Sequence, residues 1–142
     1  MSKLQHINIV QEFDVPVAQL FAKLSEHENL NQIFAPAKVK RLKDGNDSRN
    51  GIGSVRQIIL PLAPAVEETN TAYVENKLIE YTITSKGGPI KDHYGTMTFI
   101  DLGNRSRLEY HIQFAGRLPL VGLLVKLALQ DGIQRGLKKM RF

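Results

Sequence analysis

The sequence of 142 residues contains no cysteine. This absence excludes disulfide bonds, thiolate metal sites and a cysteine nucleophile. Long hydrophobic runs are missing as well: the longest apolar stretch, residues 118–129, contains Pro119 and Lys126 and falls short of the ~20 residues that a membrane-spanning helix needs. The amino-terminal segment alternates apolar and polar residues and has no apolar signal core. We therefore predict a cytoplasmic protein.

Motifs for nucleotide binding, hydrolysis and metal binding are also lacking. Gly51 and Gly53 look like the start of a dinucleotide-binding loop, but Arg56 stands where the third glycine belongs and a strand is expected to follow instead of a helix. There is no phosphate-binding loop and no G-x-S-x-G elbow. No two histidines have the i, i+4 spacing of a helical metal site, and no carboxylate cluster accompanies them. We predict neither a metal nor a cofactor.

The chain is basic, with a net charge of +5 and an isoelectric point of about 9.6. A basic excess can favour nucleic acid, an anionic membrane or acidic ligands. The charges are scattered, however, and the densest group, residues 38–43, divides between the two faces of an extended strand. Aromatic residues are not interleaved with the basic ones, as a base-stacking surface requires. We therefore predict no nucleic-acid partner.

The apolar pattern changes twice along the chain. Residues 4–13 alternate as a strand. A short helix is predicted next, from an apolar stripe formed by Val17, Leu20, Phe21 and Leu24. A second short helix is expected to end before Pro36, and a long one to run from about residue 120 to 140. Between them, six further strands are predicted near residues 37–43, 53–60, 66–74, 78–85, 92–101 and 106–115.

Tight links between successive strands favour an antiparallel meander. A sheet with only three helices to cover it must curl to bury its inner face, and the apolar C-terminal helix is the natural filler. No linker and no internal repeat interrupts the pattern. The sequence thus predicts one α+β domain over residues 1–142. Its curved, seven-stranded antiparallel sheet wraps around a long C-terminal helix, with two short helices after the first strand.

Two segments resemble a known superfamily. The segment IEYTITSKGGPIKDHYGTMTFIDL, residues 79–102, has the pattern of two strands around a glycine-proline loop, and GIGSVRQIIL, residues 51–60, precedes it. With the apolar C-terminal helix, they resemble the START-like (SRPBCC) superfamily, which includes polyketide cyclase/dehydrase-like proteins and the birch-pollen allergen group. The resemblance spans nearly the whole chain. It implies a helix-grip fold with a ligand cavity between the sheet and the long helix.

The resemblance also implies which residues face this cavity. In similar proteins the segment after the glycine pair points a basic residue inward, here Arg56. Glu68 on the next strand is its best candidate partner; alternatively, the two form a cross-strand pair at the sheet surface. Alternation along the later strands supplies further inward positions. The predicted lining from the sheet is Arg56, Ile58, Leu60, Glu68, Ile79, Tyr81, Ile83, His93, Met97, Phe99, Tyr110 and Ile112.

The first half of the C-terminal helix is apolar nearly all round. We expect Leu120, Leu124, Leu127 and Asp131 to face the cavity. Val125 and Leu129 would then be partly exposed on the outer face, where they can contact a membrane or a second subunit. Ordinary packing under the preceding loop is the alternative.

His93 is the one histidine that the strand pattern places toward the cavity. An inward-facing His93 beside tyrosines can act as a general acid or base, because its unperturbed pKa of ~6.5 suits proton transfer near neutral pH. A histidine that is only hydrogen-bonded is the commoner case. His6, His27 and His111 are expected at the surface.

Three functions follow from these features. The first is binding or transport of a small hydrophobic molecule (a lipid, an isoprenoid or an aromatic, polyketide-like compound), oriented by Arg56, Tyr81 and His93. The second is a polyketide cyclase or dehydratase that uses His93 with Arg56 or Tyr81. The third is a protein that contacts a membrane or forms a homodimer through its C-terminal helix. Few ionisable residues are expected in the cavity, which favours binding over catalysis.

Overall fold

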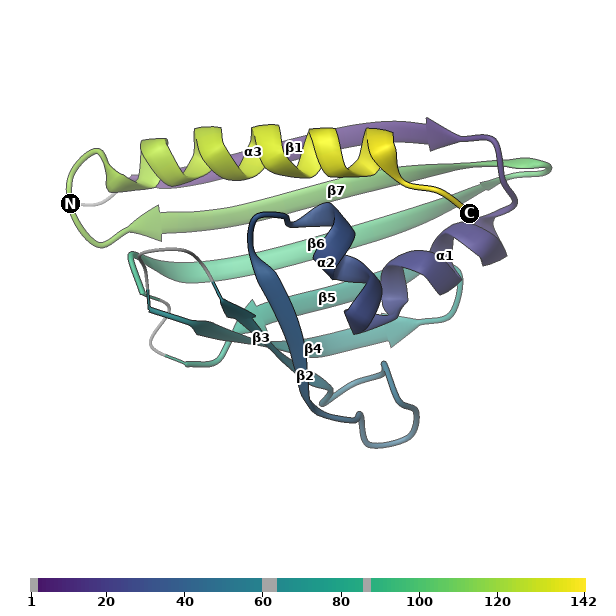
Figure 1. The fold of residues 1–142 in the computed structure, drawn as a ribbon, viewed down its shortest axis with the longest axis horizontal. Coiled ribbons are helices and arrows are strands. Elements are labelled where there is room, and N and C mark those ends of the chain that lie inside the picture. The colour runs from purple at the N-terminus through teal and green to yellow at the C-terminus, as the bar shows by residue number, and fades with distance from the viewer. Residues whose placement is uncertain (1–2, 60–63, 86–87) are drawn as a thin grey trace.

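The computed structural model of the chain describes residues 3–59, 64–85 and 88–142. One strand, short helices, six strands and a long helix follow one another, as the sequence predicts (Figure 1). The strands are β1 (Leu4–Phe13), β2 (Lys38–Lys43), β3 (Val55–Ile59), β4 (Val66–Val74), β5 (Leu78–Ile83), β6 (Ile90–Leu102) and β7 (Arg105–Gly116). The helices are α1 (Val17–Ser25), the 3-10 turn η1 (His27–Asn29), α2 (Leu30–Ile33) and α3 (Val121–Lys139).

The strands form one antiparallel sheet in the order β1-β7-β6-β5-β4-β3-β2. Six consecutive strands make the predicted meander, and β1 pairs with the last of them in a long register in which Ile7 faces Ile112 and Ile9 faces Tyr110. The helix α3 lies along β1 and β7 and contacts both (Figure 1). The predicted helix-grip architecture is confirmed.

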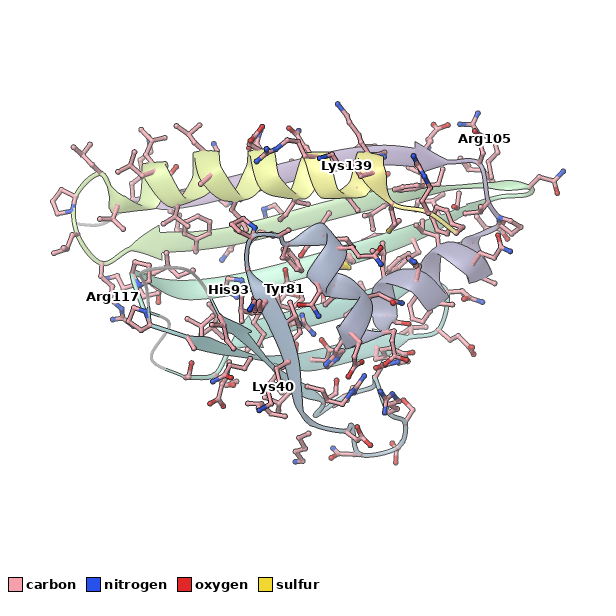
Figure 2. The ribbon with its side chains drawn as sticks, viewed as in Figure 1. Lys40, Tyr81, His93, Arg105, Arg117 and Lys139 are labelled. Carbon is pink, nitrogen blue, oxygen red and sulfur yellow. The ribbon has the colours of Figure 1, made fainter. Side chains whose placement is uncertain are left out.

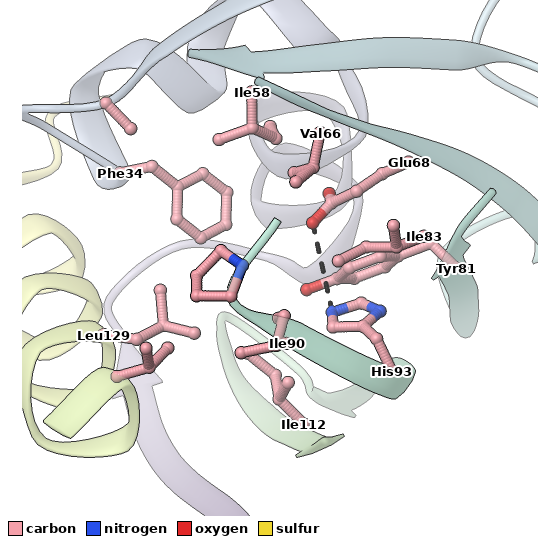
Figure 3. Close-up of a pocket in the computed structure, with 13 residues that line it drawn as sticks. Phe34, Ile58, Val66, Glu68, Tyr81, Ile83, Ile90, His93, Ile112 and Leu129 are labelled. Carbon is pink, nitrogen blue, oxygen red and sulfur yellow. Dashed lines mark ion pairs between the residues drawn. The ribbon is translucent and has the colours of Figure 1, made fainter. Parts of the chain in front are cut away.

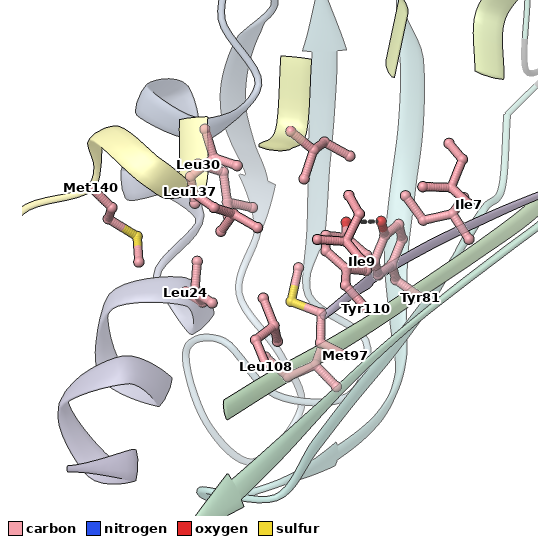
Figure 4. Packing of buried hydrophobic residues seen from close by; sticks show 14 of the residues in the cluster. Ile7, Ile9, Leu24, Leu30, Tyr81, Met97, Leu108, Tyr110, Leu137 and Met140 are labelled. Atoms are coloured by element: carbon pink, nitrogen blue, oxygen red, sulfur yellow. Dashed lines mark hydrogen bonds between the residues drawn. The ribbon is translucent and has the colours of Figure 1, made fainter. Parts of the chain in front are cut away.

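The core lies between the inner face of this sheet and the helices. Alternate residues of β6 and β7 point into it, because side chains along a strand alternate between the two faces. Figure 4 shows how α1 and the end of α3 close this core from one side. Each large side chain removed from water there contributes roughly 1.5–3 kcal/mol. The buried side chains of these four elements include Leu20, Leu24, Met97, Phe99, Leu108, Ile112, Phe114, Ile133 and Leu137.

The two helices α2 and α3 pack at very close range. A Cβ atom added to Gly136 would overlap the backbone of Ile33, so no larger residue fits at this crossing without a shift of the backbone. Ile133 and Leu137, on either side of that glycine, are fully buried. The second half of α3 is therefore anchored to α2. Over the described residues, no helix is long and apolar enough to cross a membrane.

Candidate functional site

A cavity of about 140 Å³ lies between the sheet and the helices α2 and α3 (Figure 3). Most of its wall is apolar. Among the described residues that line it, only Glu68 and His93 carry a carboxylate or an imidazole, and Tyr81 adds a phenol. The full lining is Phe34, Ala37, Ile58, Val66, Glu68, Tyr81, Ile83, Pro89, Ile90, His93, Ile112, Val125 and Leu129.

The polar end of the cavity is built by neighbouring strands. Glu68 on β4 lies opposite Ile83 on β5, and Tyr81 follows in the same inward phase. On β6 the register shifts between Lys91 and Tyr94, with Asp92 in the left-handed region (φ 55°). Such a bulge changes which side chains point inward. Because of it, Ile90 and His93 both reach the cavity, although strict alternation would place them on opposite faces.

Tyr81 is completely enclosed at this end. Its ring covers Gly95 on β6, where any side chain would overlap the ring atoms. Its hydroxyl forms a short hydrogen bond with the hydroxyl of Tyr110 on β7 (Figure 4). Burial raises the pKa of both phenols, chiefly by desolvation, so both stay protonated at neutral pH. Tyr81 thus presents a neutral, hydrogen-bonded phenol at this end of the cavity, and Tyr110 supports it from the adjoining core.

Arg56 is buried behind Glu68. Its Nε donates to Glu68 Oε1 at 3.0 Å and its Nη1 to Asn70 Oδ1 at 3.1 Å, while its guanidinium carbon lies 4.6 Å from the centre of the Tyr81 ring. The side chains of Arg56 and Glu68 are only 3% and 12% exposed. The pair is therefore internal, not a surface pair. Among the described lining residues, Glu68 contacts the cavity and Arg56 does not.

The same network continues to η1. Asn70 Nδ2 donates to Ser54 Oγ at 3.1 Å, and Ser54 Oγ lies 3.2 Å from His27 Nε2. His27 is 1% exposed, so the prediction of a surface position is wrong. The reason is that η1 turns its first residue inward against Ser54, which immediately precedes β3. Burial, followed by the nearby positive charges of Arg56 and Arg41, lowers the pKa of His27 to about 3. This histidine is neutral.

His93 is also neutral and faces a carboxylate. Its Nε2 is 4.0 Å from Glu68 Oε2, which is too far for a direct hydrogen bond. Its Nδ1 has no hydrogen-bond partner within the described part of the chain. Desolvation lowers the pKa of the imidazole, and Glu68 partly opposes this effect. The gap between His93 and Glu68 is a place where a small polar group can accept from one side chain or donate to the other.

The opposite end of the cavity is apolar, and its wall is a single layer of side chains. Phe34 and Leu129 face the polar residues across the space in Figure 3. Phe34, Ala37, Val125 and Leu129 line not only the cavity but also an outer groove of about 440 Å³ between α3 and the α2–β2 connection. These side chains are therefore a partition, one residue thick, between the inner cavity and the groove.

The residues predicted from the sheet divide into four groups. Ile58, Glu68, Tyr81, Ile83, His93 and Ile112 line the cavity. Ile79, Met97, Phe99 and Tyr110 are buried in the adjoining core. Arg56 is sealed behind Glu68, and Leu60 lies outside the described residues.

The prediction for α3 is wrong in its helical phase. Leu120, Leu124 and Leu127 are 76%, 65% and 56% exposed, and the Asp131 side chain is 67% exposed in an ion pair with Arg135. Val125 and Leu129, expected on the outer face, line the cavity. The first half of the helix is apolar on both sides, so its own pattern does not reveal which side is buried.

Several lining residues were missed by the sequence analysis. Val66 has the same strand phase as Glu68, and this signal was available. Ile90 was missed because of the bulge in β6. Phe34 and Ala37 belong to the connection after α2, where no periodic pattern predicts a direction. Within the described ranges, no group of three or more histidine, aspartate or glutamate side chains is arranged to hold a metal ion.

The sequence profile for "Polyketide cyclase / dehydrase and lipid transport" matches residues 5–141. The chain belongs to this family. None of the curated protein sequences matches the chain. The match to the family profile confirms the START-like resemblance proposed from the sequence, and this match covers almost the full length of the chain.

Solved structures agree with the family in their fold. A START superfamily protein from Mycobacterium smegmatis superposes with a TM-score of 0.75 at 15% identity, covering 94% of each chain. The Zhui aromatase/cyclase from Streptomyces sp. R1128 gives 0.68 at 16% identity, over 96% of this chain and 88% of that one. Norcoclaurine synthase from Thalictrum flavum, in complex with dopamine and hydroxybenzaldehyde, gives 0.63 at 12% identity, over 99% and 90%. At such identities the likeness establishes the fold alone.

Proposed function

We propose that this family member binds, and thereby carries, a small hydrophobic molecule in the cavity between the sheet and α3. The observation that supports this most is a largely apolar space of about 140 Å³ with polar groups at one end only. Ligand sites combine apolar walls with a few polar groups that orient the ligand. An engineered apolar cavity of about 150 Å³ in another protein takes up benzene. A space of this volume therefore suits a ligand portion of about one aromatic ring.

The polar end favours a neutral ligand. The charge of Arg56 is already matched by Glu68 at 3.0 Å, so the guanidinium offers no free charge to an anionic headgroup. A hydroxyl group placed between Glu68 and His93 would donate to the carboxylate and accept from the imidazole. The ligand class that fits is thus an aromatic or isoprenoid compound with a hydroxyl or similar neutral polar end.

Larger ligands of this class extend through the thin partition. Phe34, Val125 and Leu129 make no hydrogen bond through their side chains, so rotation of these groups disturbs only apolar contacts. Their displacement would join the cavity to the groove of about 440 Å³ beyond them. A two-ring compound or a prenyl chain would occupy both spaces.

Phenol and 2-naphthol are suitable probes, since each has a hydroxyl and they differ by one ring. We expect both to raise the melting temperature and to bind in calorimetric titrations. Ile83→Phe, which fills part of the cavity, should weaken phenol binding about tenfold or more, a loss of about 1.4 kcal/mol. Ile59→Phe makes the same change at an exposed position of β3 and should leave binding unchanged. Equal effects of the two variants, or no stabilisation by either probe, would overturn the proposal.

A cyclase or dehydratase is the second candidate, and the neutral His93 beside Glu68 is the observation that favours it. A neutral imidazole can accept a proton from a substrate carbon or hydroxyl. Arg56 and Tyr81, the residues predicted to act with His93, are less available to a substrate. Arg56 is paired with Glu68, and the Tyr81 hydroxyl is hydrogen-bonded to Tyr110. Turnover of a poly-β-carbonyl compound that disappears in His93→Gln, while 2-naphthol still binds, would establish this activity.

A cytoplasmic location of the protein stays a prediction.

A further inference from the structure

Five leucines at the start of α3 and in the connection before it are exposed to solvent. Leu118, Leu120 and Leu124 are 66%, 76% and 65% exposed, and Leu123 and Leu127 are 45% and 56% exposed. We call these five residues the leucine patch. Other exposed large apolar residues, such as Val10, Leu42 and Leu102, are scattered over separate strands. Single exposed apolar residues are ordinary, whereas a contiguous cluster marks an interaction surface.

The backbone holds this patch outward. Gly122 packs against Gly116 at the end of β7, and this close approach fixes which side of α3 meets the sheet. The leucines of the patch that lie on α3 then point away from the sheet. Leu120 begins the helix in the left-handed region (φ 70°), which a bulky residue rarely adopts. Observed backbone strain of this kind is concentrated at functional surfaces.

Positive charges surround the leucine patch. Lys3, Lys91 and Arg117 line a groove of about 640 Å³ together with Leu118, Leu120 and Leu123. Lys126 comes just before Leu127 in the sequence and lies to one side of the patch leucines around α3, and Figure 2 shows Arg117 at the end of the molecule where α3 begins. Arg117 also donates from Nε to the Gly88 carbonyl at 3.0 Å, which holds its side chain at this end.

Carboxylates are scarce on this surface. The described residues of the groove include none, and the nearest acidic residue along α3, Asp131, is paired with Arg135 at 3.0 Å. The leucine patch therefore combines exposed leucines with the positive charges of Lys3, Lys91 and Lys126, and no carboxylate is among the described residues that line the groove. Apolar side chains beside lysine and arginine are the features of a helix that lies in a membrane interface.

We propose that the leucine patch docks the protein onto the surface of an anionic lipid bilayer. The leucines enter the boundary between headgroups and acyl chains, and the surrounding lysines face the lipid phosphates. A second copy of the chain is a poorer occupant, because a two-fold interface would bring the lysines beside one patch against the same lysines of the other copy. The proposal goes beyond ligand binding and does not depend on it.

Docking in this orientation would place the cavity next to the bilayer. Leu124 and Leu127 alternate along α3 with Val125 and Leu129, which form part of the partition of the cavity. In this orientation the outer side of α3 would be in contact with lipid and its inner side would line the cavity. The helix alone would then separate the cavity from the bilayer. An apolar ligand would then pass between cavity and membrane over a short path.

Co-sedimentation with vesicles tests the proposal on the full chain. The protein should bind vesicles of phosphatidylcholine with phosphatidylglycerol, bind pure phosphatidylcholine far less, and dissociate as salt is added, since salt screens charge attraction. Leu124→Ser/Leu127→Ser should reduce binding at least about tenfold. The matched control, Leu42→Ser/Leu102→Ser, replaces exposed leucines elsewhere and should bind like the parent. Lys91→Gln/Lys126→Gln should lose about fivefold per charge.

Two results would overturn the proposal. One is an absence of binding by the parent to anionic vesicles at low salt. The other is a parent dimer in sedimentation equilibrium that Leu124→Ser/Leu127→Ser converts to a monomer, which would assign the patch to self-association. The same leucine variant should bind phenol like the parent, so failure of the docking and failure of the proposed cavity function are distinguishable.

Discussion

The two ends of the cavity are made in different ways. The polar end consists of Glu68, His93 and Tyr81 on adjacent strands; a hydrogen bond from Arg56 holds Glu68, and one with Tyr110 holds Tyr81. The apolar end consists of Phe34 and Ala37 from the connection after α2 and of Val125 and Leu129 from α3, whose side chains have no polar atoms. Buried side chains that are hydrogen-bonded to one another, as Arg56 is to Glu68 and Tyr81 to Tyr110, permit few arrangements, whereas apolar side chains can repack among rotamers. The polar end therefore fixes the orientation of a ligand, and the apolar end adapts to its length.

The largest effect is expected from breaking the polar end. Arg56→Met would leave Glu68 without its partner in a buried site and should lower the free energy of unfolding by about 3–5 kcal/mol. Urea denaturation measures this change. Arg105→Met is the control: its ion pairs to Glu12 and Asp14 are exposed, and surface pairs contribute about 0–1 kcal/mol. A loss below about 1 kcal/mol for Arg56→Met would show that the polar end is not a rigid unit.

A second comparison separates the two sides of α3, on which the apolar end depends. Leu137→Ala removes a fully buried side chain and should lower the free energy of unfolding by about 2–5 kcal/mol. Leu127→Ala, the same change on the exposed side, should stay within about 0.5 kcal/mol. Thermal and urea unfolding of both variants checks the phase of the helix. Equal losses would mean that the first half of α3 is buried after all.

The neutral histidines predict a pH dependence for the polar network. In the unfolded chain His27 binds a proton below about pH 6.5, whereas in the folded chain it does so only near 3. The unfolded state then binds more protons, so the free energy of unfolding falls as the pH drops from about 6.5 toward 3, by about 1.4 kcal/mol per pH unit for this residue. The lowered pKa of His93 acts in the same direction.

His27→Gln tests this contribution, because glutamine does not titrate. Between about pH 6 and 4, the variant's stability should fall less steeply than the parent's, by about 1.4 kcal/mol per pH unit. Urea denaturation at several pH values provides the slopes. Parallel slopes for the variant and the parent would mean that His27 is accessible to protons in the folded state.

A small loss of stability is expected from a change in the partition, the side chains that separate the cavity from the outer groove. Phe34→Ala should cost about 2 kcal/mol, since Phe34 is only partly buried. It should also open the cavity toward the groove, so that 2-naphthol binds more tightly relative to phenol by about tenfold. Calorimetric titration of both probes measures the ratio. An unchanged ratio would mean that the groove takes no part in binding.

The polar end of the cavity, which is built from strands, was easier to predict from the sequence than the apolar end, which depends on a helix. On strands the inward positions repeat every second residue, so Ile58, Glu68, Tyr81 and Ile83 could be predicted from alternation once one residue was placed. His93 was predicted in the same way. Ile90 was not, because the bulge at Asp92 depends on a local backbone conformation that alternation does not contain.

The helical end was less predictable. In the first half of α3 the stripe through Leu124 and Leu127 is as apolar as the one through Val125 and Leu129. The second half would have decided between them, because the first stripe continues into Asp131 and the second into Ile133. The contact between Gly136 and the Ile33 backbone, which fixes this phase, joins residues far apart in the sequence. No periodic signal within the helix reveals such a contact.

The most direct test of the central claim is a methyl and amide NMR titration of the protein with phenol. The account predicts saturable shifts that are largest for Ile58, Val66, Ile83, Val125 and Leu129 and for the amide of His93, with little change at the exposed Leu42 and Leu102. Shifts confined to surface residues, or none up to the solubility of the probe, would contradict the claim that this cavity is a ligand-binding site.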